Sequence, residues 1–294
     1  MNKNIVEEKF EKFVRDNNVI LDSKVIDYIG INVTESAYNE MKFKAYLKHN
    51  YSVKENNTLV NWLEEREMIR YISSVQDKND KRRRRCDIGL KNRSNSNMHD
   101  LFKVLSKETI LSEINLNEII KLSKMKVTNL KDFDYSGLYF LGFIEVEKKI
   151  KMVKTHYINR VCNNPDVLHK NYKYNDDYFL KYIDTIPNCK LKILKPFIKQ
   201  IINECGANLW MFGVDYSSMN KKYKIYLKNI VDVDIYNVLS KVFDDTRFID
   251  LRKQISELSI WNEQYTEWYC EGIALGISSR DEYTINFYYK LRVE

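Results

Sequence analysis

The chain has 294 residues, of which 44% are hydrophobic and 13% aromatic, and its formal net charge is +7. With eight Gly and three Pro residues, it lacks the composition of a disordered chain, a collagen-like repeat or a sandwich built on Gly/Pro turns. The length and the apolar content suit one extensive core, so we expect a single domain over residues 1–294. The positive charge favours an anionic partner such as a diphosphate, a nucleic acid or an acidic peptide.

Metal and membrane sites are not indicated by the sequence. The five cysteines are far apart and form no CxxC pair, and the four histidines form no HExxH or HxH set. The first residues, MNKNIVEEKFEKFVRDNN, are charged and contain no apolar signal core, and no stretch approaches ~18 consecutive apolar residues. We therefore predict a cytoplasmic protein with no bound metal of its own and no membrane partner. The oligomeric state is not predicted.

Helical and strand periodicities alternate along the chain. Residues 5–16 place Val6, Phe10 and Phe13 on one helical face, whereas residues 40–48 have apolar side chains at every second position, as in a strand. Further helices are predicted at 58–68, twice within 95–130, at 177–183, at 196–205 with Pro196 in the first turn, and within 233–265. Strands are predicted at 69–75 and 85–91, and hairpins at 137–147 with 150–158 across a Lys-Lys turn, 209–216 with 223–229, and 269–278 with 282–291.

This order of elements determines the fold class. Antiparallel hairpins separated by helices cannot form the parallel sheet of a βαβ protein. We predict an α+β protein of repeated α-β-β-α units, in which the hairpins lie side by side as an antiparallel barrel inside a ring of helices.

Several short segments carry a resemblance to a known family. In chain order they are EMKFK (40–44), DFDYSGLYFLGFIEVE (132–147) followed by KTH (154–156), MFGVDY (211–216), YKIYLKN (223–229), WYCEGIALG (268–276) and INFYYKL (285–291). With these segments the chain resembles the ABBA prenyltransferases, in particular the peptide prenyltransferases of cyanobactin-type pathways. The resemblance covers about 250 residues through short, degenerate motifs. It implies five α-β-β-α units and an active site in the lumen of the barrel.

The stretch between Tyr226 and Tyr288 is about 40 residues shorter than the resemblance implies. Two alternatives follow: the barrel is incomplete and open, or residues 66–91 supply a hairpin of their own. An open lumen would suit a peptide acceptor.

The resemblance also implies the reaction and its residues. A dimethylallyl or geranyl group would pass from its diphosphate, which could carry Mg²⁺ with it, to a peptide side chain or an aromatic small molecule. The diphosphate would be held by buried cations, an allylic cation would be shielded by aromatic rings, and a carboxylate would accept the proton that the acceptor loses. By position, the diphosphate-binding residues are Lys44, Arg85, Lys154, His156 and Lys224, the shielding residues are Tyr226 and Tyr288, and the proton acceptor is Glu40.

Other interpretations of the same residues remain open. The strand faces that carry Lys154, His156 and Lys224 could be solvated, and Asn286, Tyr288 and Lys290 could belong to a packed core. Glu40 and Lys44 could instead form an i,i+4 ion pair on a helix.

The run KRRRR (81–85) and the sequence DDTRFID (244–250) permit two further functions. The run could be a solvated loop or the basic patch of a non-catalytic nucleic-acid-binding protein, which is the alternative function. The Asp-rich sequence resembles a magnesium motif of all-helical isoprenoid enzymes, but no second motif accompanies it, so we interpret Asp244 and Asp245 as a turn or helix cap.

Overall fold

The computed structural model describes residues 5–19, 24–36, 41–48, 57–77, 83–124, 131–161, 173–174, 176–186, 190–218, 220–230, 234–256, 268–277 and 282–291. The helices are α1 (Ile5–Asp16), α2 (Thr58–Glu65), α3 (Asn95–Glu108), α4 (Glu113–Ser123), α5 (Asp176–Thr185), α6 (Leu191–Cys205), α7 (Ile235–Phe243) and α8 (Arg247–Ser256). The barrel strands are β1 (Ile26–Thr34), β2 (Lys42–Leu47), β3 (Ile69–Asp77), β4 (Arg83–Leu90), β5 (Leu138–Val146), β6 (Lys149–Ile158), β9 (Asn208–Ser217), β10 (Lys221–Lys228), β11 (Trp268–Ile277) and β12 (Tyr283–Leu291). A small separate ladder pairs β7 (Arg160–Val161) with β8 (Lys173–Tyr174).

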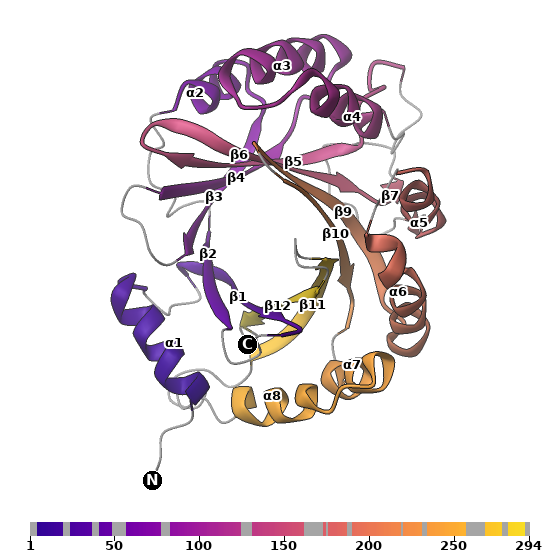
Figure 1. Cartoon of the computed structure of the whole chain (residues 1–294). Helices are drawn as coiled ribbons and strands as arrows, with labels where there is room; N and C mark the ends of the chain where they lie inside the picture. The colour runs from indigo at the N-terminus through magenta and orange to yellow at the C-terminus, as the bar shows by residue number, and fades with distance from the viewer. Residues whose placement is uncertain are drawn as a thin grey trace.

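Ten strands close into one antiparallel barrel in the order β1-β12-β11-β10-β9-β6-β5-β4-β3-β2. The circuit closes at β1, which pairs with β2 on one side and with β12 on the other, so that Gly30 lies opposite both Lys44 and Tyr288. Figure 1 shows the strands surrounding a central lumen, with the helices outside them. Closure leaves the barrel without an unpaired edge and gives each strand an inner and an outer face.

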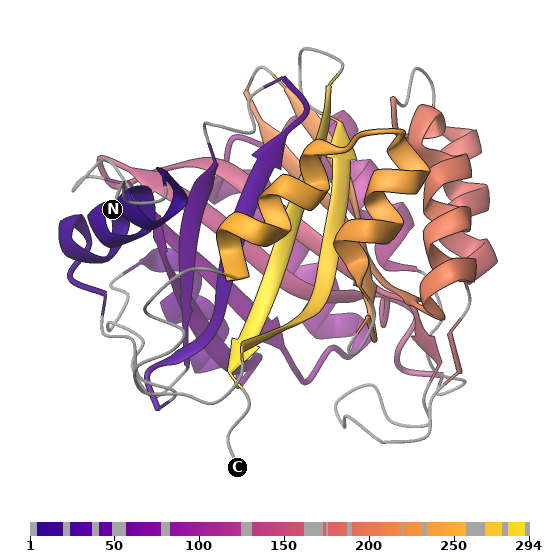
Figure 2. The same ribbon diagram turned by 90° about the horizontal axis from the view of Figure 1, so that it is seen from below.

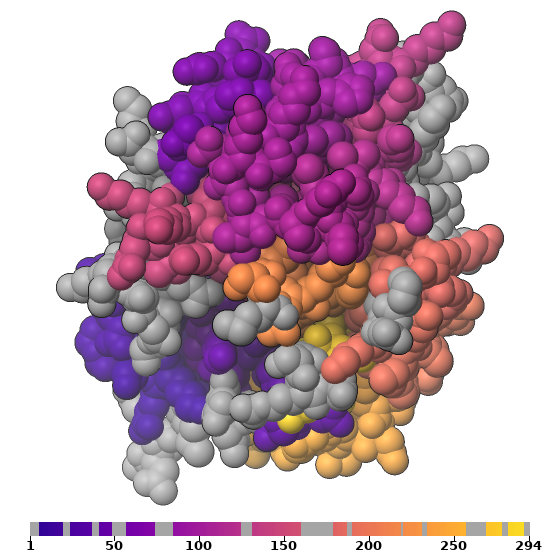
Figure 3. All heavy atoms as spheres, turned by 45° about the horizontal axis from the view of Figure 1, so that its top comes forward, coloured from indigo at the N-terminus to yellow at the C-terminus, as the bar shows by residue number. Residues whose placement is uncertain are grey.

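Side chains that point alternately out of and into the barrel form two separate apolar clusters. The larger core lies between the outer strand faces and the helices, and it includes Phe10 of α1, Leu101 of α3, Ile198 of α6 and Phe287 of β12. A small second cluster, Met211, Tyr226 and Ala274, lies inside the lumen. Figure 2 shows α7 and α8 crossing the outside of β11 and β12, and in Figure 3 the atoms of α2 to α4 form a continuous layer over another side. The outer core stabilises the barrel, and the lumen is left for other side chains.

The predicted barrel of α-β-β-α units surrounded by helices is confirmed. The structure also decides between an open barrel and an additional hairpin from residues 66–91, the two alternatives raised by the short stretch between Tyr226 and Tyr288. Strands β3 and β4 form the hairpin that residues 66–91 were expected to supply, so the open or incomplete barrel is wrong. The sequence interpretation overlooked β1, although Ile29, Ile31 and Val33 alternate with Gly30 and Asn32 in the strand pattern.

Several element boundaries also differ from the prediction. Helix α6 begins at Leu191, so Pro196 lies inside the helix rather than in its first turn. The β5–β6 turn is made by Glu147 and Lys148, whose positive φ angles are typical of a tight hairpin turn. The segment 233–265 contains two helices, α7 and α8, rather than one, and residues 257–265 lie outside the described part of the chain. Within the described residues, no helix is long and apolar enough to span a membrane.

Arg93 connects the segment between β4 and α3 to the start of β5 through hydrogen bonds. Its side chain is completely buried, and Nη1 donates to the carbonyl oxygens of Ser136 (2.7 Å) and Leu138 (2.8 Å). The guanidinium also lies over the ring of Tyr139, 5.1 Å from its centroid. Because buried carbonyls need donors, this one side chain satisfies the carbonyl of the first residue of β5 and that of Ser136 just before it.

Arg93→Met should lower the free energy of unfolding by roughly 2–4 kcal/mol, because two buried carbonyls lose a charged donor. Urea denaturation measures this loss. The matched control is Arg252→Met, since Arg252 pairs with Asp234 on the surface, where the loss should stay below about 1 kcal/mol. Equal effects of the two substitutions would contradict the role assigned to Arg93.

Candidate active site in the barrel lumen

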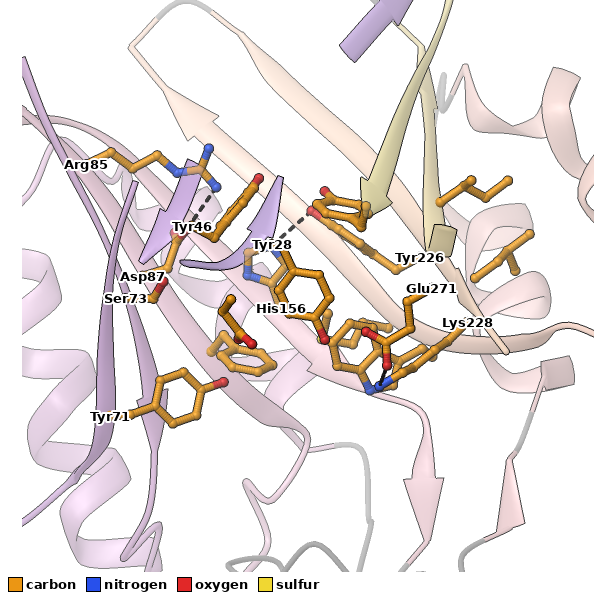
Figure 4. A pocket seen from close by; sticks show the side chains of 18 residues that line it. Tyr28, Tyr46, Tyr71, Ser73, Arg85, Asp87, His156, Tyr226, Lys228 and Glu271 are labelled. Carbon is orange, nitrogen blue, oxygen red and sulfur yellow. Dashed lines mark hydrogen bonds and ion pairs between the residues drawn. The ribbon is translucent and has the colours of Figure 1, made fainter. Parts of the chain in front are cut away.

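A cavity of about 150 Å³ lies in the lumen and is lined by side chains from all parts of the chain. The strands contribute inward-facing residues at every second position, for example Lys154 and His156 on β6 and Lys224 and Tyr226 on β10. The aromatic lining residues are Tyr28, Tyr46, Tyr71, Phe140, Trp210, Tyr226 and Tyr288. The charged lining residues are Asp27, Arg85, Asp87, Lys228 and Glu271. Figure 4 shows that Arg85 and Asp87 lie at one side of this cavity, with Glu271 and Lys228 at the other.

A basic cluster of Arg85, Lys154, Lys222 and Lys224, with the carboxylates of Asp87 and Asp215, lies in the lumen. Its centre is formed by two lysines and one carboxylate. Nζ of Lys224 lies 2.7 Å from Oδ2 of Asp215, and Nζ of Lys154 lies 3.4 Å from the same oxygen. Although burial alone would raise the pKa of Asp215, the charges of Lys154 and Lys224 hold this pKa well below its usual value. Burial, with the Arg85 charge nearby, lowers the pKa of Lys154 to about 7, and Asp215 opposes this shift. Burial also lowers the pKa of the neighbouring Lys222 to about 8.

Arg85 and Asp87 form the second ion pair of this basic cluster. Nη2 of Arg85 lies 2.8 Å from Oδ2 of Asp87, and both side chains are largely buried. Although burial raises the pKa of Asp87, Arg85 lowers it, and the net shift is downward. The guanidinium lies 5.5 Å from the centroid of the Tyr46 ring. Cations exceed carboxylates here, which makes this side of the lumen suited to an anion.

His156 forms part of the aromatic wall rather than adding a charge. Its Nε2 lies 3.0 Å from the hydroxyl of Tyr226, and the two rings are 5.3 Å apart. Burial lowers the pKa of His156 to about 4, with Asp87 and Asp215 opposing the shift, so the imidazole is neutral at pH 7. A contribution of His156 to anion binding would therefore be a hydrogen bond and not a positive charge.

Three tyrosines, Tyr46, Tyr226 and Tyr288, lie next to one another along one wall of the lumen. The Tyr288 ring lies 5.8 Å from that of Tyr46 and 6.1 Å from that of Tyr226. Gly30 makes room for this group, because a Cβ at that position would lie 3.0 Å from the Tyr46 ring. Electron-rich ring faces stabilise a nearby cation by roughly 0.5–2 kcal/mol each. This wall is thus suited to an apolar group that develops positive charge.

The side of the cavity away from Arg85 and Asp87 is formed where the pairing register of two strands shifts. Register shifts beside Tyr28 and beside Gly272 allow adjacent residues, Asp27 with Tyr28 and Glu271 with Gly272, to line the cavity together. Glu271 lies 2.8 Å from Nζ of Lys228, and that Nζ lies 4.9 Å from the centroid of the Trp210 ring. Burial would raise the pKa of Glu271, but Lys228 and the Tyr28 hydroxyl lower it.

The sequence-predicted residues are placed as follows. Arg85, His156, Tyr226 and Tyr288 line the cavity. Lys154 and Lys224 do not line it; they converge on Asp215 beside it, on the strands that carry His156 and Tyr226. Lys44 lies on the lumen-facing side of β2, two residues before Tyr46, but it does not line the cavity. Glu40 lies outside the described residues, as do Lys81 and Arg82 of the basic run. The binding and catalytic roles of all these residues stay predictions.

Other predicted residues have structural partners. Asn286 accepts a hydrogen bond from Asn32 (2.8 Å), and Lys290 lies 4.0 Å from Asp27. The interpretation of Asp244 and Asp245 as a turn and cap agrees with the structure, since Asp244 ends α7 with φ 52° and Asp245 accepts from the Arg247 amide at the start of α8. Among the described residues, no three or more His, Cys, Asp or Glu side chains are grouped as metal ligands.

Sequence reasoning missed several lumen residues. Tyr46, Asp87 and Lys222 each lie two residues from a predicted site residue, so strict alternation along the same strands would have identified them. Asp215 lies within the MFGVDY segment, but only the pairing of β9 with β6 and β10 shows that it meets two lysines.

Arg85→Met should reduce the free energy of unfolding by roughly 3 kcal/mol, because Asp87 would remain buried without its cation. The double variant Arg85→Met/Asp87→Asn removes both charges and should recover much of that loss. Urea titrations of the wild type, both single variants and the double variant give the coupling between the two residues. Strictly additive losses would contradict the ion pair as the reason.

Comparison with known proteins supports the fold assignment. No protein-family model matches the chain, and no curated protein sequence matches it. Among solved structures, AnaPT from Neosartorya fischeri superposes with a TM-score of 0.60 at 10% identity, over 96% of this chain and 87% of that one. The NotF prenyltransferase superposes with a TM-score of 0.58 at 8% identity, over 90% of this chain and 80% of that one. With its closed ten-strand barrel and ring of helices, the chain therefore has the fold of the ABBA prenyltransferases.

Proposed function

We propose that the protein is a prenyltransferase that moves a dimethylallyl or geranyl group from its diphosphate to an acceptor. The observation that carries the proposal is that a buried basic cluster adjoins a wall of tyrosines inside this barrel: Arg85 of the cluster lines the cavity together with Tyr46, Tyr226 and Tyr288, and its guanidinium lies 5.5 Å from the Tyr46 ring. An allylic diphosphate has the same two parts, an anion and an apolar chain that becomes cationic when the C–O bond breaks. Preformed charges away from water stabilise the departing diphosphate most effectively.

Each part of the reaction is assigned to a region of the lumen. Arg85, Lys154 and Lys224 bind the diphosphate, with Lys44 and His156 as further contacts. Tyr226 and Tyr288 shield the allylic cation from water, and Tyr46 completes that wall. Any Mg²⁺ in this proposal is carried by the diphosphate.

The acceptor occupies the opposite side of the cavity, beside Tyr28, Trp210 and Glu271. The acceptor nucleophile attacks the allylic carbon, a carboxylate takes the proton, and diphosphate is released. Glu40 remains in the proposal as that carboxylate through the family resemblance. The acceptor is a peptide side chain or an aromatic small molecule; the complete barrel removes the suggestion that a missing hairpin admits a peptide.

The alternative of nucleic-acid binding rests on the run at 81–85. Arg85 of that run lies inside the barrel and pairs with Asp87, so it does not belong to an exposed patch. Phosphate-driven binding to nucleic acid would weaken steeply as salt concentration rises. This dependence distinguishes the alternative from a buried diphosphate site.

Calorimetric titration with dimethylallyl S-thiolodiphosphate, which resists ionisation, tests the proposed function. We expect micromolar binding by the wild type and losses of roughly tenfold or more for Lys154→Met and for Lys224→Met, because each removes a charged contact worth about 1.5–3 kcal/mol. Lys195→Met on α6 is the matched control, since Lys195 pairs with Asp184 outside the barrel. No binding of the analogue, together with salt-sensitive binding of a short RNA duplex, would replace the proposal with the alternative.

Affinity for the same analogue should fall as pH rises above about 7. Lys154 has a pKa of about 7 in the free protein, and a bound diphosphate raises that pKa, so binding takes up a proton once Lys154 is neutral. The contribution of Lys154 to the affinity is therefore fully present below this pKa, and above it decreases by up to about tenfold per pH unit. Titrations in two buffers of different ionisation enthalpy measure the proton uptake. A constant affinity from acidic to alkaline pH would contradict this role of Lys154.

A further inference from the structure

Asp215 occupies the centre of the basic cluster, where an anion would be expected to bind. On β9 it is the register partner of Lys154 in β6 and of Lys222 in β10, so it lies between basic residues of both neighbouring strands. Only 7% of the residue is exposed, and its Oδ2 atom lies within 3.4 Å of both Lys154 Nζ and Lys224 Nζ. A single oxygen thus joins two ammonium groups that come from different strands.

A carboxylate in this place has two opposite possible effects on an incoming diphosphate. It repels the anion directly, because like charges meet in a region shielded from water. It also holds the two ammonium groups in one place, because these groups beside each other and beside Arg85 would otherwise repel one another, and its charge raises the pKa of Lys154. These two effects predict changes of opposite sign when the carboxylate is removed.

We propose that Asp215 is a positioning residue of the anion site, which holds the ammonium groups of Lys154 and Lys224 together at one point of the lumen. The inference rests on the proposed function and adds a residue to it. Asp215 gives up no proton and forms no bond to the substrate; it acts through the two lysines. The basic cluster remains positive with Asp215 present, since Arg85, Lys154, Lys222 and Lys224 outnumber Asp87 and Asp215.

The groups that face Lys154 support the positioning effect over the repulsive one. Arg85 and Asp87 face it from β4, Asp215 from β9 and Lys224 from β10. Burial, Arg85 and Lys224 all lower the pKa of Lys154, while Asp215 is the strongest influence that raises it. Without the Asp215 charge, the pKa of Lys154 would fall further, and the site would lose a cation at neutral pH.

The test is Asp215→Asn, which keeps the shape of the side chain and removes its charge. Calorimetry with dimethylallyl S-thiolodiphosphate should show affinity reduced by roughly tenfold or more at about pH 7, and recovered as the pH falls and Lys154 regains its proton. The midpoint of the pH dependence should move to lower pH by about one unit or more. Adding Lys154→Met to Asp215→Asn should cost little further affinity at neutral pH, because Lys154 is already neutral there.

Two further variants separate charge from structural damage. Asp215→Glu retains the charge and should keep a pH midpoint near that of the wild type, whereas Asp215→Ser removes the charge with a smaller side chain and should behave as Asp215→Asn does. Asp184→Asn is the matched control, because Asp184 accepts from Lys195 at an exposed site between α5 and α6. Circular dichroism verifies that each variant is folded.

The outcomes are distinct. Equal or tighter binding by folded Asp215→Asn or Asp215→Ser at every pH, while the wild type binds the analogue, would overturn the positioning role and leave the proposed function intact. Failure of the wild type itself to bind the analogue would instead overturn the proposed function. Weaker binding by the charge-removing variants that is not recovered at low pH would also overturn the inference, because lost positioning through Lys154 must respond to its protonation.

Discussion

Burying cations inside a barrel requires a partner for each of them, and the lumen of this protein is organised around that constraint. An unpaired charge away from water is costly, so Arg85 is held by Asp87, and Lys154 and Lys224 share Asp215. The net charge of the basic cluster remains positive, because its cations outnumber its carboxylates. A site that is already shielded, already ordered and still positive can bind an anion without first reorganising, which is the arrangement that electrostatic catalysis requires.

In the closed barrel, the side chains that form the main hydrophobic core and those that line the cavity lie on opposite faces of the strands. Outward-facing side chains of the strands pack with the helices into one large core, and inward-facing side chains from the same strands form the cavity. Tyr157 on β6 is buried among core residues, while its neighbour His156 contacts Tyr226 in the lumen. The packing that supports the barrel and the side chains that line its cavity therefore lie on opposite faces of the same strands, and this architecture superposes on AnaPT and NotF at only 8–10% identity.

The fold was largely predictable from sequence because its signals are local. Alternation and helical periodicity identified most strands and helices, and the order of hairpins and helices excluded a parallel sheet. The exceptions have physical causes. Strand β1 has the alternating pattern in Ile29, Ile31 and Val33, but Gly30 between them is disfavoured in strands and obscured it, and the break between α7 and α8 depends on Asp244 in a left-handed conformation. Neither Gly30 nor the conformation of Asp244 gives a clear signal in the local sequence.

The candidate site was predictable only in part, because its contacts join strands that are distant in sequence, and the roles of its residues stay predictions. Lys154, Lys224, Tyr226 and Tyr288 were identified through the family resemblance, and the pattern of alternate residues would have added Tyr46 and Lys222. Asp215 could not be assigned from spacing, since its two lysines come from β6 and β10. The neutrality of His156 likewise depends on burial, which the sequence does not show.

The central claim is that one cavity binds the diphosphate beside Lys154 and Lys224 and the prenyl chain beside Tyr226 and Tyr288. A crystal structure of the protein with dimethylallyl S-thiolodiphosphate tests it most directly. The account predicts diphosphate oxygens within hydrogen-bond distance of both lysine Nζ atoms and the prenyl chain against the tyrosine rings. An analogue bound outside the barrel, or in the lumen but away from both lysines, would contradict it.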